Sequence, residues 1–354
     1  MKSYIMNRKF DTLIFFTLTR SIYGTRERFK NTDLKNIQIL SHFRLYSQLN
    51  PPIEKGLSPG WVSGFTDAEA SFSLKIIRRA GYKLGWGVEP SFIIGLHAKE
   101  LPLLEKIQAF FGVGNISIGN NNSVTYYVSS VNDLIEVIIP HFDKFPLITQ
   151  KRADFLLFKF ALEIINNKEH KKSLTYEYIS KLISIKATLN WGLSDVLKEA
   201  FPDIAPALRP NVELPKHISP EWLAGFIDGE GCFYVLVSNS KLHKAGASVQ
   251  LQFSITQHNR DNELMTLIKD FLNCGFIKNK KNQPSVEIVV TRLSDIQNNI
   301  LPFLQKNPLQ GAKLLDYLDF VKVVELMKNK AHLTPEGVDQ IKKIKSEMNK
   351  KRKS

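Results

Sequence analysis

Residues 58–72 read SPGWVSGFTDAEASF, and residues 219–233 read SPEWLAGFIDGEGCF. The two stretches are near copies that lie 161 residues apart, and this spacing pairs Glu69 with Glu230. Each stretch has the composition of a short helix that ends in a carboxylate. A duplicated helix of this kind predicts a pseudo-twofold molecule with two acids beside its axis. Such a molecule is suited to carry out the same chemistry twice.

The repeat continues well beyond these two stretches. Phe92 matches Phe253 at the same spacing of 161, and downstream the spacing becomes 162, as for Lys151 and Lys313. One inserted residue within 277–291 accounts for the change. A register held over about 110 residues indicates a tandem duplication, which sets the architecture before any motif is interpreted.

Composition and charge narrow the class of protein. A chain of 354 residues with 43% hydrophobic residues is long enough for two domains with extensions. The net charge of +14 and the pI near 9.5 favour a polyanionic partner, with nucleic acid first and an anionic membrane surface second; a merely soluble basic protein is the alternative. Cys232 and Cys274 have no metal-ligand spacing, which argues against a zinc site or a disulfide framework. No apolar run approaches the roughly 20 residues that span a bilayer.

The chain divides into five segments. The segment 1–52 matches neither repeat and could be a transit peptide, a disordered arm or translated upstream sequence; these alternatives stay open. We predict repeat one at 57–170, a connector helix and proline-rich linker at 171–216, repeat two at 217–332, and a basic tail at 333–354.

Each repeat reads as helix, strand, strand, helix, strand, strand, helix, helix, which predicts an α+β fold of two pseudo-symmetric αββαββαα units with antiparallel sheets. Ser58 and Ser219 are N-cap candidates because a proline follows each of them at the first helical position. Small residues recur four apart on one face of each helix, which lets two helices approach closely. These residues are Gly64 and Ala68 in the first helix, and Gly225 and Gly229 in the second. Ordinary helix–sheet packing is the alternative explanation.

The strands after the acids alternate between apolar and polar residues, which predicts one face packed on helices and one face open. Polar side chains on an open face carry the donors and acceptors that read base edges in a major groove, although a plain solvated face is the alternative. The candidate DNA contacts in repeat one are Ser71, Ser73, Lys75, Ile77, Arg79, Glu89, Ser91, Ile93, Asn115, Ser117, Tyr127 and Ser129. Those in repeat two are Cys232, Tyr234, Ser238, Gln250, Gln252, Ser254, Thr256, Lys278, Lys280, Glu287 and Thr291.

The motifs GFTDAEA at 64–70 and LAGFIDGEG at 223–231 resemble the two signature helices of the LAGLIDADG homing endonucleases. The chain is similar to the single-chain, two-motif group of that family, which fungal mitochondrial introns encode. Further similar stretches are FSITQH at 253–258 and PLITQK at 146–151, and the resemblance covers about residues 57–350. The first motif departs at Ala70, where the family usually has glycine.

The resemblance implies a metal-dependent endonuclease for double-stranded DNA whose sheets form a DNA-binding saddle. It implies that Glu69 and Glu230 bind the metal together with the backbone carbonyls of Ala68 and Gly229. Mg²⁺ is the expected ion because it favours carboxylate oxygens, and Ca²⁺ or Mn²⁺ can stand in its place. The resemblance also implies a mitochondrial location. The duplication within one chain predicts that the protein acts as a monomer, and no membrane partner is expected.

Other polar residues of these motifs receive separate interpretations. Lys280, with Lys278 beside it, is a candidate to position water or stabilise the transition state, and plain phosphate contact is the alternative. Asp67 and Asp228 lie two residues before the glutamates and should point away from the catalytic face, so we interpret them as structural. The paired histidines of the second strands, His97 and His258, are more often structural than catalytic at such positions.

A strand of ten residues spans about 33 Å, which matches about ten base pairs at 3.4 Å each. Two repeats therefore predict a target of about 20 base pairs, which is asymmetric because the two outward faces differ. The alternatives on the same scaffold are a maturase that binds its own intron RNA and a DNA-binding protein that does not cleave. The presence of both glutamates favours the nuclease.

Overall fold

The computed structural model describes residues 56–82, 84–167 and 175–349. All described residues belong to one compact unit, Lys55–Ser354. The predictions for residues 1–52 and for the end of the basic tail lie outside the described residues. Within the described part, no helix is long and apolar enough to cross a membrane.

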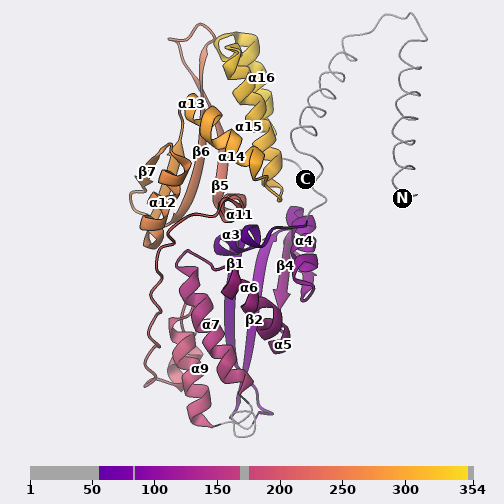
Figure 1. Ribbon diagram of the computed structural model, residues 1–354, viewed down its shortest axis with the longest axis vertical. Helices are drawn as coiled ribbons and strands as arrows, with labels where there is room; N and C mark the ends of the chain where they lie inside the picture. Colours follow the sequence, from indigo (N-terminus) through magenta and orange to yellow (C-terminus); the bar gives the residue numbers. More distant parts are fainter. Residues whose placement is uncertain (1–55, 83, 168–174, 350–354) are drawn as a thin grey trace, which may run out of the picture. The chain divides into compact units, whose positions relative to one another are not determined.

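Two equivalent helices, α3 (Pro59–Glu69) and α11 (Pro220–Glu230), lie against each other at the centre of the unit (Figure 1). Both begin as predicted, because Ser58 Oγ accepts from the Trp61 amide at 3.1 Å and Ser219 Oγ accepts from the Trp222 amide at 3.3 Å. A Cβ atom on Gly64 would lie 1.8 Å from the Trp222 carbonyl oxygen. The predicted close approach of the two helices is therefore confirmed, and glycine is required there.

Each helix leads directly into an antiparallel four-stranded sheet. The first sheet has the order β1 (Ala70–Arg78), β2 (Trp86–His97), β4 (Ser123–Val128), β3 (Asn115–Ile118). The second has the order β5 (Gly231–Asn239), β6 (Ala247–His258), β8 (Ser285–Val290), β7 (Phe276–Asn279). The registers are equivalent, since Phe72 pairs with Phe92 in one sheet and Phe233 with Phe253 in the other. This confirms the predicted α+β fold of two repeated units.

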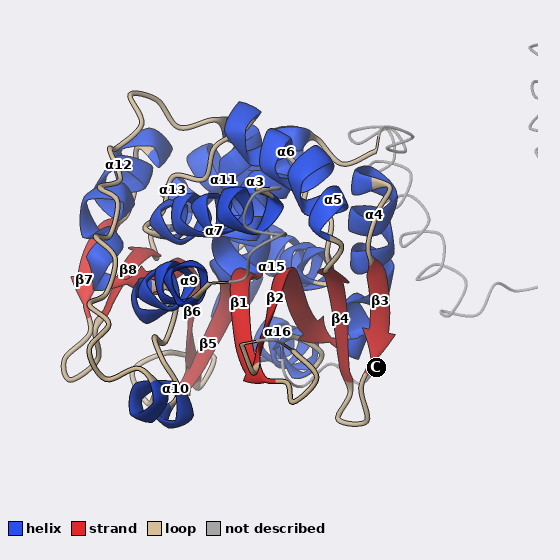
Figure 2. Cartoon of the chain, turned by 90° about the horizontal axis from the view of Figure 1, so that it is seen from below, coloured by secondary structure: helices blue, strands red, loops and turns tan. Residues whose placement is uncertain are grey.

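Helices cover one face of each sheet, as Figure 2 shows with the strands gathered along one side and most helices along the other. In repeat one these helices are η1 (Ala98–Glu100), α4 (Leu101–Phe111), α5 (Val131–Asp133), η2 (Leu134–Ile138), α6 (Ile139–Lys144), α7 (Lys151–Asn166), α9 (Tyr176–Thr188) and α10 (Asp195–Ala200). In repeat two they are η3 (Asn259–Asp261), α12 (Asn262–Leu272), α13 (Leu293–Asp295), η4 (Ile296–Ile300), α14 (Leu301–Lys306), α15 (Lys313–Lys328), η5 (Ala331–Leu333) and α16 (Pro335–Ser346).

An aromatic core lies between sheet and helices in each repeat. Phe72, Phe92 and Phe158 are fully buried in the first repeat, and Phe233 and Phe320 hold the matching places in the second. A fully buried phenylalanine contributes about 1.5–3 kcal/mol relative to an exposed one. The two cores thus give each repeat its own packed interior and leave the opposite sheet face free for another task.

In each repeat, an asparagine that follows a helix donates a hydrogen bond to the first strand. After α9, Asn190 has a φ of +52° and its Nδ2 donates to the Phe72 carbonyl at 2.7 Å. After α16, Asn349 has a φ of +57° and its Nδ2 donates to the Phe233 carbonyl at 3.1 Å. Asparagine tolerates this left-handed conformation better than most residues. The segments that follow α9 and α16 are therefore tied to the first strands of their repeats in the same way.

Candidate active site and nucleic-acid interface

Glu69 and Glu230 are the last residues of the two central helices, so both carboxylates leave the helix pair at the same end. A Cβ atom on Gly229 would lie 2.2 Å from Ala68 Cβ and 3.4 Å from Glu69 Oε1. The Glu69 carboxylate therefore lies beside the backbone of the opposite repeat. At this shared end, an acid of repeat one thus lies next to the backbone of repeat two.

The carboxyl group of Glu230 has a pKa well above its usual range. Burial first, and the negative charge of Glu69 second, raise its pKa to about 7, although Lys313 and Lys151 oppose the shift. Two carboxylates that repel each other in a buried position form a site that a cation would stabilise. Among the described residues there is no group of three or more His, Cys, Asp and Glu side chains placed to hold a metal ion. A metal here would need backbone carbonyls or water as further ligands.

Two half-buried lysines supply positive charge at this site. Lys151 is the first residue of α7, and its Nζ donates to the Thr66 carbonyl at 2.9 Å. Lys313 is the first residue of α15, and its Nζ donates to the carbonyls of Ile227 and Gly229. Burial lowers the pKa of both ammonium groups, whereas the neighbouring carboxylates, including both glutamates, raise it.

Sequence reasoning did not single out these lysines for chemistry. It used Lys151 and Lys313 only as markers of the repeat and named Lys280 as a catalytic candidate. Lys280 directly follows β7 and is half-buried, and its charge acts on the thiol of Cys232 by lowering a pKa that burial raises. A catalytic role for Lys280 stays a prediction. The sequence did contain one indication for Lys151 and Lys313, because each is a lysine at the first position of the equivalent helix in its repeat.

The aspartates of the two motifs hold the loops that precede these lysines. Asp67 accepts from the Ile148 amide at 2.9 Å, from Thr149 Oγ1 at 2.5 Å and from Trp222 Nε1 at 2.8 Å. Burial raises the pKa of Asp67 to about 6, although these hydrogen bonds and Lys151 oppose the shift. The side chain points into the protein, in agreement with a structural role.

Asp228 has the equivalent task in repeat two, where it accepts from the amides of Gln310 and Gly311. Burial raises its pKa to about 6 as well. The paired histidines are also structural, since His97 Nδ1 accepts from the Lys99 amide at 3.2 Å and His258 Nδ1 accepts from the Arg260 amide at 3.1 Å. Each histidine caps the short helix that follows it.

The free face of the first sheet carries the residues predicted for repeat one. Ser71, Ile93, Tyr127 and Asn115 form one cross-strand row, and their side chains are exposed or half-buried. The others lie on the same alternation or directly beyond a strand: Ser73, Lys75, Ile77, Arg79, Glu89, Ser91, Ser117 and Ser129. Glu89 pairs with Arg79 and, at 3.8 Å, with Lys75, so both cations are partly engaged on this face.

The second sheet agrees with the prediction at most positions and differs at two. Cys232, Tyr234, Ser238, Gln250 and Lys278 are exposed, and Gln252, Thr256, Lys280 and Thr291 are half-buried. Ser254 and Glu287 are only 5% and 8% exposed. Ser254 lies between Cys232 and Val289 in its row, and Glu287 lies between Thr256 and Lys278. Alternation gave the correct face, but side chains of neighbouring strands cover these two, so we correct their predicted accessibility.

Three further side chains share the free faces and were missed. Thr125 lies between Gly95 and Ser117 in the first sheet. Leu236 and Phe276 are exposed on the second sheet. Continuing the alternation along β4, β5 and β7 would have found them, but two are apolar and did not suggest base reading.

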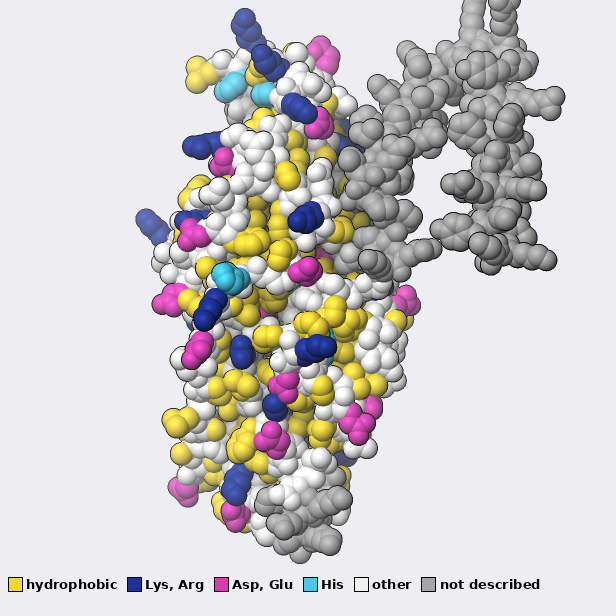
Figure 3. Space-filling model, in the orientation of Figure 1, with side chains coloured by type: hydrophobic (Ala, Val, Ile, Leu, Met, Phe, Trp, Pro, Cys, Tyr) yellow, Lys and Arg dark blue, Asp and Glu magenta, His cyan; other side chains and the backbone are white. Residues whose placement is uncertain are grey.

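Lysine and arginine side chains are interspersed with acidic and hydrophobic ones on the face that Figure 3 presents, in the orientation of Figure 1. The described residues form no continuous basic patch in that view. Charge alone therefore does not mark this face as the interface, and the sheet faces next to Glu69 and Glu230 remain the candidate.

Comparison with known sequences identifies related proteins. The sequence profile of the LAGLIDADG endonucleases matches residues 62–162 and 223–324, one match in each repeat. The chain is 38% identical over 305 residues to "Probable intron-encoded endonuclease 2" of Neurospora crassa, covering 83% of this chain and 65% of that protein. It is 40% identical over 287 residues to "Probable intron-encoded endonuclease 3" of the same fungus, covering 79% of this chain and 52% of that protein. The chain thus spans between half and two thirds of these relatives.

Solved structures with the same fold include complexes of the meganuclease I-SmaMI. Its complex with uncleavable DNA has a TM-score of 0.81 and 42% sequence identity, covering 84% of this chain and 99% of that one. Its complex with cleaved DNA also has a TM-score of 0.81 and 42% identity, covering 85% and 100%. A third structure shows I-SmaMI on uncleaved target DNA in the presence of calcium ions, with a TM-score of 0.80 and 42% identity, covering 83% and 99%. Variants of that enzyme with a lysine replaced by alanine have been solved as well.

Proposed function

This chain belongs to the LAGLIDADG endonuclease family, and on that basis we propose that it is a homing endonuclease that cuts both strands of one asymmetric DNA site. The observation that carries this proposal is the pair of glutamates at the shared end of α3 and α11, where Glu69 lies beside Gly229 of the opposite repeat and its charge acts on Glu230. Two acids related by a pseudo-twofold axis match two antiparallel DNA strands. The presence of both acids favours cleavage over the RNA-binding and non-cleaving alternatives.

The residues present fit a divalent cation at each of two composite sites. Glu69 with the Gly229 carbonyl, and Glu230 with the Ala68 carbonyl, would hold it, and the repulsion that raises the pKa of Glu230 is the electrostatic condition a cation relieves. The Lys313 ammonium on the Gly229 carbonyl shows that this oxygen accepts a cationic partner. Magnesium is the proposed ion, because it binds carboxylate oxygens and keeps several waters. When bound, such ions supply an activated water and neutralise charge on the phosphate.

The lysines and aspartates have complementary tasks in this proposal. Lys151 and Lys313 hold positive charge beside the glutamates, where negative charge develops on a phosphate during cleavage. Asp67 and Asp228 fix the loops before these lysines and stay out of the reaction. For Lys280, beyond the end of β7, we propose a role in positioning water or stabilising the transition state, with plain phosphate contact as the alternative.

The two free sheet faces are the proposed DNA-binding saddle. Their exposed polar side chains, such as Ser73, Gln250 and Gln252, offer donors and acceptors to base edges, while lysines such as Lys278 contact phosphate. Each sheet would cover one half of a target of about 20 base pairs. One chain supplies both halves, so we propose that it acts as a monomer. Because its relatives are named as intron-encoded proteins of fungi, we also propose an intron origin and a mitochondrial location.

Two substitutions that remove a charge but keep the side-chain shape test this function. Glu69→Gln or Glu230→Gln removes a negative charge from the site and preserves the side-chain shape. We expect each to slow double-strand cleavage by at least about a hundredfold and to change DNA affinity by less than about threefold, because the binding surface is elsewhere. Cleavage of end-labelled target and fluorescence anisotropy measure the two quantities. A Glu230→Gln protein that cuts both strands near the wild-type rate would refute the assignment.

A further inference from the structure

The helix starts that carry the two active-site lysines are held by acids from the opposite repeats. Asp261, at the end of η3 in repeat two, accepts from the Gln150 amide at 2.7 Å. Glu100, at the end of η1 in repeat one, accepts from the Ala312 amide at 2.9 Å. Gln150 is the N-cap residue of α7 and Ala312 is the N-cap residue of α15, so a lysine follows directly in both cases.

The N-cap residues themselves contribute no capping side chain, although Thr149 Oγ1 accepts from the Lys151 amide at 3.1 Å in α7. The side chains of Gln150 and Ala312 make no capping hydrogen bond to the first turn of α7 or α15. A free helix start leaves unsatisfied amides and a partial positive charge, and a carboxylate satisfies both. The acid that does so here comes from a different repeat. The N-cap amide of each lysine-bearing helix therefore depends on the docking of the two repeats for its acceptor.

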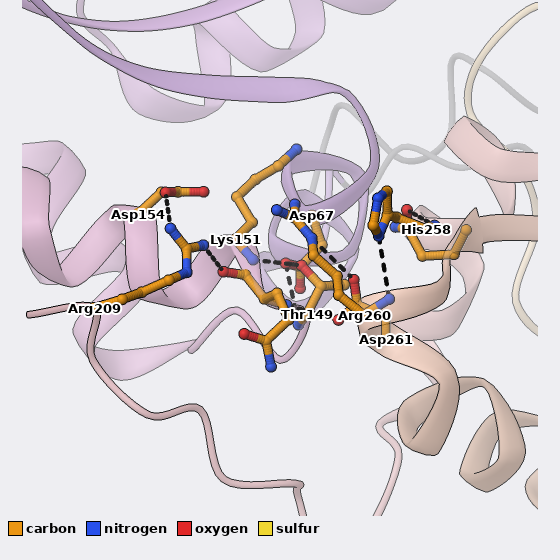
Figure 4. A network of polar contacts seen from close by, with 10 residues as sticks. Asp67, Thr149, Lys151, Asp154, Arg209, His258, Arg260 and Asp261 are labelled. Carbon is orange, nitrogen blue, oxygen red and sulfur yellow. Dashed lines mark hydrogen bonds and ion pairs between the residues drawn. The ribbon is translucent and has the colours of Figure 1, made fainter. Parts of the chain in front are cut away.

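A second acid holds the same loop from within its own repeat. In the first half, Asp67 holds Ile148 and Thr149 immediately before Gln150 (Figure 4). In the second half, a Cβ atom on Gly311 would lie 3.0 Å from Glu100 Oε2 and 3.1 Å from Asp228 Oδ1. In each half, therefore, one carboxylate from each repeat contacts the same turn, and these contacts restrict the movement of its backbone.

The linker adds a contact in the first half. Arg209 donates to Asp154 Oδ1 at 2.9 Å and to the Gln150 carbonyl at 3.0 Å, so it holds the first turn of α7 from the side opposite to the amide that Asp261 binds (Figure 4). The backbone that carries Lys151 is consequently fixed at several atoms. The ammonium group at the end of that side chain can then occupy a defined place beside the glutamates.

We propose that Glu100 and Asp261 are reciprocal positioning residues, each of which fixes the position of the lysine in the opposite repeat. Glu100 fixes the start of α15 and thereby Lys313, and Asp261 fixes the start of α7 and thereby Lys151. Neither acid touches the reacting atoms. The proposal rests on the nuclease function proposed above and adds a specific consequence: each acid serves one composite site, and so one DNA strand.

Strand-resolved cleavage of target DNA tests this assignment. We expect Glu100→Ala to slow cleavage of one strand by about tenfold or more, because a small displacement of a catalytic group is costly, and to leave the other strand nearly unaffected. Asp261→Ala should slow the opposite strand, so the two variants accumulate nicked DNA of opposite polarity under single-turnover conditions. DNA affinity without divalent cations should stay within about twofold of the wild type, since neither acid lies on the free sheet faces. Matched controls are Glu105→Ala and Glu263→Ala, which remove exposed acids from the adjoining helices.

Conservative variants separate positioning from general stability. Glu100→Gln and Asp261→Asn keep an oxygen acceptor and should restore most of the rate. Glu100→Asp and Asp261→Glu keep the charge but move the acceptor by one methylene, so they should show the same strand bias in a smaller degree even where an alanine variant fails to fold. In a Lys313→Ala background, Glu100→Ala should add little further loss.

The outcomes are distinct. Three results would overturn the positioning role. Both strands could be slowed equally, or the same strand could be slowed by both alanine variants. Glu100→Asp and Asp261→Glu could also cut the two strands in the same ratio of rates as the wild type. Failure of the wild-type protein to cut any target would instead contradict the nuclease function on which the role depends.

Discussion

At the scale of single residues, the protonation of Glu230 is central to the proposed metal site. Burial first, and the charge of Glu69 second, raise the pKa of Glu230 to about 7. A carboxylate with a raised pKa keeps its proton over a wider range, so below about pH 7 the proton competes with any metal for the same oxygens. Metal binding and proton release are therefore coupled at this residue.

This coupling predicts that the affinity for a divalent cation increases with pH. Below the pKa Glu230 is mostly protonated, so between pH 8 and pH 6 we expect the affinity of the DNA complex for Ca²⁺ to fall by about tenfold. Calorimetric titration at the two pH values measures the change. In the metal-free protein, Glu69→Gln removes the repelling charge and should move the titration of Glu230, followed by NMR, to lower pH. An affinity that does not depend on pH between 6 and 8 would contradict the prediction.

At the scale of elements, the central helix pair depends on small residues placed against a specific partner. Gly64 and Gly225 face backbone carbonyls of the opposite helix, and Gly229 faces the side chain of Ala68. The first kind of contact cannot relax without moving a helix. The second can relax if the opposing side chain is made smaller, and this difference is testable.

Gly229→Ala should destabilise the protein by about 1–3 kcal/mol, because its Cβ would lie 2.2 Å from Ala68 Cβ. Adding Ala68→Gly should recover most of this loss. Gly64→Ala should cost more and resist rescue, since the new Cβ would meet the Trp222 carbonyl at 1.8 Å. Chemical denaturation gives the free energies of unfolding, with Gly81→Ala as the control because no atom lies within 4 Å of its Cβ position. Additive effects in the Ala68→Gly/Gly229→Ala double variant would show that the two residues do not compete for the same space.

The sequence predicted those features of the elements that depend on local pattern. The N-caps at Ser58 and Ser219, the small faces of the central helices and the alternation of the strands all follow from spacing, and the structure confirms them. The burial of Ser254 and Glu287 depends on neighbours in adjacent strands, which alternation within one strand does not contain. The sheet face on which a residue lies was therefore predictable, whereas its solvent accessibility was not.

Features that join distant segments were beyond the sequence pattern. Lys151 and Lys313 reach the site only because α7 and α15 begin beside the central helices, and Glu100 and Asp261 cap those helices across the repeat boundary. The equivalence of Asn190 and Asn349 was hidden because their spacing of 159 differs from that of the preceding residues. Duplication revealed which positions correspond, but only the packed molecule shows which of them meet.

At the scale of the whole molecule, one chain presents two similar but unequal sheets. In the second, Gln250 pairs across with Leu236 and Gln252 with Tyr234, so polar and apolar side chains alternate between neighbouring strands. The first sheet has serines, Lys75 and Glu89 in the corresponding region. Unequal faces predict an asymmetric target in which each repeat reads its own half.

Gln252→Ala should relax base preference at one or two adjacent positions of a single half-site. Glutamine can pair bidentately with adenine, and such a contact discriminates by about 1–3 kcal/mol. Cleavage of all single-base variants of the target measures this preference. The control is Lys281→Ala, an exposed lysine beyond β7, which should weaken binding to every sequence and reduce the salt dependence by about one unit. A uniform loss over both half-sites in Gln252→Ala would show that Gln252 does not read bases.

The central claim is that one polypeptide with two composite acid sites cuts both strands of one DNA site. The most direct measurement is cleavage of a plasmid that carries the intron-free insertion site, at one protein chain per plasmid, with Mg²⁺ or with EDTA. We predict conversion of supercoiled to linear plasmid with Mg²⁺, no cutting with EDTA, and no cutting when an intron interrupts the site. Binding without cutting in Mg²⁺, or a requirement for two chains per site, would contradict the account.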